Sequence, residues 1–221
     1  MNYLAHGYRF LSDPLFLAGT AVPDWLSVVN RKVRARRRLV IPVVQSTDSK
    51  EVDRIGHGIL QHHKDDDLFH RSEIFMQLES ELGLEFRRYM PDRFDHRPGF
   101  LGHIVVELML DASIVADDPH ILDQFYAAMD LVNEETVQSV VNQMVTRTTD
   151  RLAWFIRRFR EVRFLYDYRR NDRMFLRLNQ VLSRVKLPAM HAECLKVLPI
   201  ARELLSERGP ELLQTVAGPG D

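Results

Sequence analysis

The sequence has a single cysteine, Cys194, among its 221 residues. A disulfide framework and a thiolate metal site each need a second cysteine, so both are excluded and a reducing compartment is expected. No apolar run approaches the roughly 20 residues of a membrane span. Residues 15–22 are interrupted by Gly19 and followed by Pro23 and Asp24, which does not fit a signal peptide. We therefore expect a cytoplasmic protein without a membrane span.

Neither sign of charge is in excess, since 30 Lys and Arg residues balance 31 Asp and Glu residues. The net charge of −1 therefore gives no reason to expect nucleic acid or an anionic membrane as the partner. The sequence has no repeat at a fixed period. With 45% hydrophobic residues it can bury a core. We predict one domain over residues 1–221, with a metal-site half (1–118), a helical half (119–215) and a frayed tail (216–221).

Strand patterns are scarce as well. Only residues 40–45, which include Pro42, have the composition of a strand, and one short strand has no sheet to join. Apolar residues elsewhere recur at spacings of three and four, which is typical of helices. The predicted fold class is therefore all-α, a single-domain helical bundle.

Several helix boundaries can also be predicted. Residues 48–51 resemble a capping box that would open a helix. A helical pattern over residues 72–90 is expected to stop at Gly83 and resume for a further turn. Residues 91–99 are expected to form a loop before a helix over 100–115. Three or four more helices follow, one of them with Asn133 as its N-cap.

Residues 57–70 hold four of the nine histidines. In a helix, His62, Asp66 and His70 lie on one face, and imidazole with carboxylate suits Zn, Mn or Fe better than Ca or Mg. His62 and His70 would stand about 12 Å apart along the axis, so one ion cannot bind all three residues. Either His62 and Asp66 share an ion while His70 has another role, or there are two ions. The alternative is a solvated polar face.

The helix expected over residues 100–115 repeats this pattern, with His103, Glu107 and Asp111 four residues apart on an otherwise apolar helix. Desolvated carboxylates are costly unless something cationic meets them, so these residues are candidate metal ligands. A buried salt bridge to an arginine is the alternative.

Two further positions carry candidate groups outside these helices. Asp24 lies between Pro23 and Trp25 after an apolar run, where a carboxylate needs a partner; the alternative is that it caps a helix. His6 is a candidate ligand at a second metal site or a proton-transfer group, as is His70. A helical bundle can bring such residues together around one or two divalent ions.

Residues 31–38 contain six basic residues in eight. They are candidates for binding phosphate, an acidic carrier protein or nucleic acid, with Arg36, Arg37 and Arg38 expected to hold the phosphate or acidic partner. The alternative is a solvated connector, because no aromatic residue interleaves with the arginines as single-strand binding would favour.

Several motifs, in this order and spacing, resemble those of the acyl carrier protein phosphodiesterases. They are Met1-Asn2-Tyr3-Leu4-Ala5-His6, Gly19 with Asp24 and Trp25, Gly58-Ile59 before His62 and Asp66, and Glu107 four residues before Asp111. The resemblance implies an all-α, HD-like metallohydrolase, usually described with Mn²⁺, that releases 4′-phosphopantetheine from holo acyl carrier protein. It gives metal or catalytic roles to Asp24, His62, Asp66 and Asp111. The sequence departs from that family at Phe69-His70, where Thr-Asp is usual, and at Ala112, where a histidine is usual.

A second resemblance is to the zinc-dependent phospholipase C-type hydrolases, which are also all-helical. It rests on residues 19–24, on His62 and His70 with Asp66 midway between them, and on the pair His103 and Glu107. Both resemblances imply hydrolysis of a phosphodiester. The expected protein is therefore a metal-dependent phosphodiester hydrolase, and the alternative from another class is a non-catalytic helical binding module with buried ion-pair networks.

Overall fold

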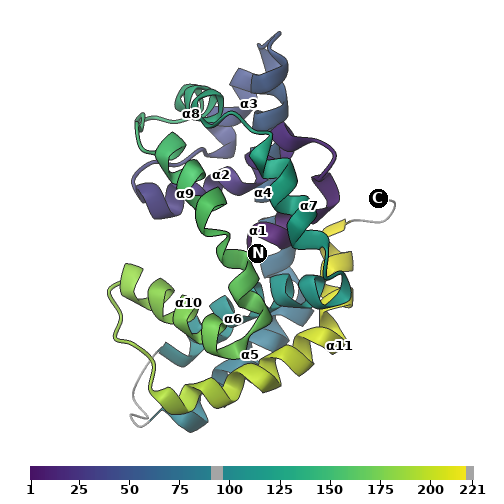
Figure 1. The fold of residues 1–221 in the computed structure, drawn as a ribbon, viewed down its shortest axis with the longest axis vertical. Helices are drawn as coiled ribbons and strands as arrows, with labels where there is room; N and C mark the ends of the chain where they lie inside the picture. Colours follow the sequence, from purple (N-terminus) through teal and green to yellow (C-terminus); the bar gives the residue numbers. More distant parts are fainter. Residues whose placement is uncertain (91–96, 218–221) are drawn as a thin grey trace. The chain divides into compact units, whose positions relative to one another are not determined.

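The computed structural model describes residues 1–90 and 97–217, and every regular element within them is helical. The predicted all-α class is therefore confirmed. This described part holds eleven α-helices, which are labelled in Figure 1. They are α1 (Tyr3–Gly7), α2 (Pro14–Val29), α3 (Arg37–Gln45), α4 (Lys50–Arg71), α5 (Glu73–Tyr89), α6 (Arg97–Asp117), α7 (Ile121–Asp130), α8 (Glu134–Gln143), α9 (Leu152–Val162), α10 (Asn171–Arg184) and α11 (Val197–Ala217), with 3₁₀ helices η1 (Tyr8–Phe10), η2 (Phe164–Arg169) and η3 (Ala192–Lys196).

The chain groups into two compact units, each made of separate stretches of sequence. One, the α2 unit, contains Tyr3–Asp67 and His120–Phe164. The second, the α6 unit, contains Met1–Asn2, Leu68–Pro119 and Leu165–Asp221. Helix α4 contributes its first eighteen residues to the α2 unit and its last turn to the α6 unit. The prediction that residues 1–221 form one domain stays a prediction.

The core of the α2 unit is built on α2, which packs against α1, α7, α8 and α9. An aromatic cluster joins these helices, since the Phe159 ring lies 5.0 Å from Tyr3, 5.5 Å from Trp25 and 6.4 Å from Phe125. All four residues are buried. Their tilted and edge-to-face geometries are the favourable ones for aromatic pairs. This core fixes α1 and α2 side by side.

Helices α2 and α4 cross at two glycines, so their backbones come into contact. A Cβ on Gly58 would lie 2.2 Å from the carbonyl oxygen of Phe16 and 2.8 Å from the Cα of Gly19. A Cβ on Gly19 would lie 2.3 Å from the carbonyl oxygen of Ile55. No side chain larger than hydrogen fits at this crossing. The backbone of α2 can therefore reach side chains on the next turn of α4.

The α6 unit is built on α5, α6 and α11, which pack against one another (Figure 1). Its α5–α6 crossing also depends on glycine, because a Cβ on Gly102 would lie 2.3 Å from the carbonyl oxygen of Glu79 and 2.8 Å from the backbone nitrogen of Gly83. Helix α6 is the one described helix that is long and apolar enough to cross a membrane, and 67% of that apolar window is buried inside the protein. Core helices pass the same test, so this is weak evidence for a span.

The structure corrects several predicted boundaries. The strand-like residues 40–45 belong to α3, and Val40 packs beside Gly56 of α4, so an apolar surface rather than a partner strand stabilises this segment. Helix α5 continues through Gly83, where the close crossing with α6 favours glycine inside the helix. Residues 97–99, predicted as the end of a loop, belong to α6. Pro98 lies in the first turn of this helix, where its missing N–H costs nothing.

Other predicted boundaries are confirmed or extended. Ser49 accepts a hydrogen bond from the backbone nitrogen of Val52 at the start of α4, so a helix does begin at the predicted capping pattern. Asn133 caps α8 through the backbone nitrogen of Thr136. The three or four helices predicted after Pro119 are five α-helices in the described residues. The remainder of the predicted loop (91–96) and most of the predicted tail (218–221) lie outside those residues.

Candidate metal centres

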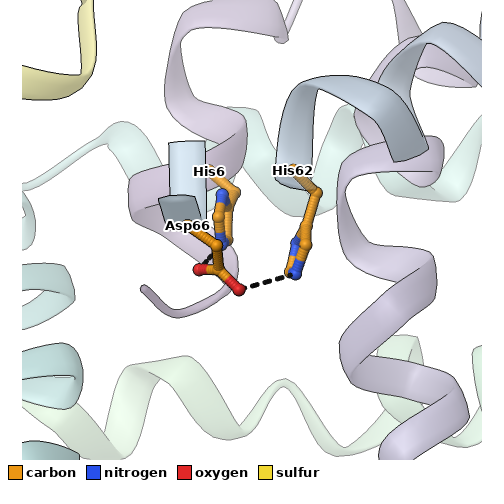
Figure 2. Close-up of side chains that lie close together, drawn as sticks. All are labelled: His6, His62 and Asp66. Atoms are coloured by element: carbon orange, nitrogen blue, oxygen red, sulfur yellow. Dashed lines mark ion pairs between the residues drawn. The ribbon is translucent and has the colours of Figure 1, made fainter. Parts of the chain in front are cut away.

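Three side chains that the sequence separates converge within the α2 unit (Figure 2). His6 comes from α1, and His62 and Asp66 stand one turn apart on α4. The Nε2 atom of His6 lies 3.2 Å from one oxygen of Asp66, and the Nε2 atom of His62 lies 3.4 Å from the other. The two imidazole rings stack at 3.9 Å. We call these residues the His6 group.

The His62 ring is held by the backbone of α2. Its Nδ1 lies 2.8 Å from the carbonyl oxygen of Thr20. A carbonyl oxygen only accepts, so Nδ1 carries the hydrogen, and in a neutral ring the lone pair is then on Nε2, facing Asp66. Metal-binding histidines in proteins are held in this way, with the second ring nitrogen donating to a carbonyl or carboxylate. The Gly19–Gly58 crossing makes this contact possible.

The second nitrogen of the His6 ring faces a second carboxylate at ion-pair distance, not at hydrogen-bond distance. Its Nδ1 lies 3.6 Å from Asp65, which is completely buried. Asp65 is fixed in turn by Arg9 at 3.2 Å and by the amide nitrogen of Gln61 at 2.6 Å. Both His6 nitrogens are buried, and neither makes a hydrogen bond of acceptable geometry within the described part of the chain. The ring therefore lies between two carboxylates that both attract a cation.

The carboxylate of Asp66 in the His6 group is stabilised in its ionised form and attracts a positive charge. Burial by itself would raise the pKa of Asp66, but the imidazoles of His6 and His62 outweigh burial and hold this pKa well below its usual range. A carboxylate facing two Nε2 atoms needs either protons on those nitrogens or a metal ion between them. His6 and His62 are buried, whereas the Asp66 side chain is 34% exposed. A ligand from solvent would therefore approach on the Asp66 side.

A second group of two histidines and one carboxylate lies in the α6 unit. His70 Nε2 is 3.1 Å from Glu107 Oε1, and His103 Nε2 is 3.4 Å from the same oxygen. Glu79 accepts a hydrogen bond of 3.1 Å from His103 Nδ1. Burial alone would raise the pKa of Glu107, but the α-amino group of Met1, 3.3 Å away, and the two histidines hold it well below its usual range. We call His70, His103 and Glu107 the His70 group.

Two predicted ligands lie outside these groups. Asp24 is inside α2 and is not among the residues that converge on His6. The alternative interpretation of Asp24 as a helix N-cap is wrong, because α2 begins at Pro14 with Asp13 as its cap and continues through Pro23. Asp111 is completely buried in α6 and is not among the residues that converge on Glu107.

The basic segment lies next to α4. His63 Nε2 lies 2.7 Å from the carbonyl oxygen of Ala35, which ties residues 31–38 to the turn of α4 that carries His62. Burial lowers the pKa of His63, and the positive charge of Arg37 acts in the same direction. The three predicted phosphate-binding residues, Arg36, Arg37 and Arg38, are exposed, and no ion pair joins them to a carboxylate in the ranges 1–90 and 97–217.

The sequence did not lead to a prediction of the residues that orient the candidate ligands, which are Asp65, Thr20 and Glu79. Asp65 had a detectable signal, because the buried face of α4 runs through Ile55, Ile59, His62 and Phe69, and an acid three residues after His62 falls on that face. Thr20 contributes only its carbonyl oxygen, so no side-chain pattern could reveal it. Glu79 lies on a different helix from His103, and nothing local pairs them.

Comparisons of the chain with protein-family models, with curated proteins and with solved structures give no match.

Proposed function

We propose that this protein is a metal-dependent phosphodiester hydrolase whose ion binds to His6, His62 and Asp66. The observation that carries the proposal is the convergence of two imidazole nitrogens and a carboxylate, with the second nitrogen of His62 fixed by the Thr20 carbonyl oxygen. Two nitrogens and one oxygen are a donor set typical of catalytic zinc and related ions, and three protein ligands leave positions open.

The chemistry divides between the ion and the chain. A divalent ion bound by this group would supply Lewis acidity and lower the pKa of a water molecule near the phosphorus atom. The buried His6 and His62 rings would fix the direction of the ligands, and Asp65 with Arg9 and Gln61 would hold His6 in place. The exposed edge of Asp66 would face the substrate side.

The phosphodiester substrate class rests on the two family resemblances and on the basic segment. Arg36, Arg37 and Arg38 are exposed cations tied to α4 next to His62 through the His63–Ala35 contact. They suit a phosphate or an acidic protein. We therefore propose an HD-like fold, a cytoplasmic location and 4′-phosphopantetheine on acyl carrier protein as the first substrate to test, with a zinc-dependent phospholipase C-like activity as the alternative.

The test begins with the metal content of protein purified without chelator. The wild-type protein with added Mn²⁺ or Zn²⁺ should hydrolyse bis(p-nitrophenyl) phosphate, and mass spectrometry should show loss of phosphopantetheine from holo acyl carrier protein. His62→Ala and Asp66→Ala should lose both metal and activity, whereas His57→Ala, a change at an exposed histidine of the same helix, should keep both. Bound metal without hydrolysis of either ester would contradict the enzymatic proposal and favour a non-catalytic binding module.

A further inference from the structure

The geometry points to a second, separate metal site: we propose that His70, His103 and Glu107 bind their own Zn²⁺, which joins the last turn of α4 to α6 within the α6 unit. This inference goes beyond the proposed function, because it concerns other residues and requires no hydrolysis.

The three ligands converge on one point from two helices. His70 Nε2 and His103 Nε2 lie 3.1 Å and 3.4 Å from the same oxygen of Glu107, and their rings are stacked at 5.0 Å with only 10° between the planes. Both rings pack in the same way against Phe75, nearly perpendicular to its ring, with centroids 5.0 Å apart in each pair. Two parallel rings held by one phenylalanine present both Nε2 atoms toward Glu107 in fixed orientations.

The orientation of His103 has a further cause. Glu79 on α5 accepts a hydrogen bond from Nδ1, which leaves the Nε2 lone pair of a neutral ring facing Glu107. The Gly83–Gly102 crossing brings α5 and α6 close enough for this bond, because the backbone of Glu79 contacts Gly102 directly. A carboxylate that holds a histidine from behind while the other nitrogen faces a shared centre is the arrangement seen around protein-bound zinc.

The donor set selects the ion. Two imidazoles and one carboxylate match the donors of known zinc sites, whereas Mg²⁺ and Ca²⁺ prefer oxygen alone. The His70 and His103 side chains are each 32% exposed and Glu107 is 15% exposed. Solvent can therefore reach this group, and a chelator is expected to remove its ion faster than one bound between the buried His6 and His62. The alternative is an ion-pair cluster without metal, in which protonated imidazoles and the α-amino group of Met1, 3.3 Å from the same oxygen, share Glu107.

Metal stoichiometry measured on the full chain separates these possibilities. Chelator-treated protein is titrated with Zn²⁺, and with Co²⁺ as a spectroscopic probe whose visible bands report nitrogen and oxygen ligands. The wild-type protein should bind two equivalents, and His103→Ala and His70→Ala should each bind one fewer. Retention of the wild-type zinc content by both variants would overturn the inference.

A conservative variant keeps the test valid if the alanine variants do not fold. Glu79→Gln removes only the carboxylate behind His103 and should weaken zinc binding at this site 10- to 100-fold. The matched control is Glu81→Gln, a change on the same helix at a residue that faces Arg208 instead, and it should leave zinc affinity unchanged. Equal affinity in both glutamine variants would contradict the assigned role of Glu79.

The same titration distinguishes this inference from the proposed function. If the protein binds one equivalent and His62→Ala abolishes it while His103→Ala does not, the second site is refuted and the proposed function stands. If His103→Ala abolishes the single equivalent and His62→Ala does not, the second site stands and the proposed function fails.

Discussion

The Gly58→Ala variant tests whether the α2–α4 crossing positions the His6 group. The new Cβ would lie 2.2 Å from the carbonyl oxygen of Phe16, and both this atom and its neighbours at Gly19 are backbone, so no side chain can rotate away. The helices must separate by roughly 1 Å to restore ordinary contact, a strain that typically costs about 1–3 kcal/mol.

The separation also acts on His62. A movement of about 1 Å would take the 2.8 Å contact between His62 Nδ1 and the Thr20 carbonyl oxygen out of hydrogen-bond range, which costs roughly 1 kcal/mol more. Alanine regains close to 1 kcal/mol through its helix propensity. We therefore expect a net loss of about 1–3 kcal/mol in the free energy of unfolding, which lowers Tm by about 2–12 °C in a chain of this size.

The control for this variant is Gly99→Ala in the first turn of α6. Apart from its chain neighbours and the backbone of its own helix, no atom of the described residues would lie within 4 Å of its Cβ, and the position is exposed. This variant should be neutral or more stable by up to about 1 kcal/mol. The assays are urea unfolding at fixed protein concentration and Zn²⁺ titration, in which Gly58→Ala should also lose 10- to 100-fold in affinity at the His6 group. Equal stability of the two variants, or wild-type zinc affinity in Gly58→Ala, would refute the reasoning.

Three further predictions use other parts of the structure. Asp65→Asn should weaken metal binding at His6 10- to 100-fold in the Zn²⁺ titration, while Asp67→Asn, an exposed change on the same helix, should leave it unaltered. Glu134→Gln should cost about 1 kcal/mol of unfolding free energy at pH 7, measured against Glu135→Gln. Burial opposes the ionised form of Glu134, but backbone hydrogen bonding, Arg157 and Arg160 prevail and lower its pKa. The cost should therefore be present above the unfolded pKa and disappear as the pH falls through the folded pKa. Chelation should lower Tm, and Zn²⁺ at 100 times its dissociation constant should restore roughly 2.7 kcal/mol per site; an unchanged Tm would show that neither group binds metal.

The sequence by itself determined the helical class and the kinds of donor available. Spacings of three and four are local properties of a helix, so the pairing of His62 with Asp66, and of His103 with Glu107, followed directly from the chain. The rise per residue also predicted that His70 could not share an ion with His62, and the structure places the two histidines in different groups. Strand-like composition misled at residues 40–45, because β-branched residues also pack well on a helix when a neighbouring glycine makes room.

Only the tertiary structure decided which partners complete each group. His6 joins Asp66 across a sequence separation of sixty residues, and Glu79 supports His103 from another helix, so neither pairing leaves a local pattern. Helix crossings make the His62–Thr20 and His103–Glu79 contacts possible, and they depend on the absence of a side chain at Gly58 and Gly102. Periodicity identifies which residues share one helix face, but the packing of two backbones at a glycine decides which residues of another helix that face meets.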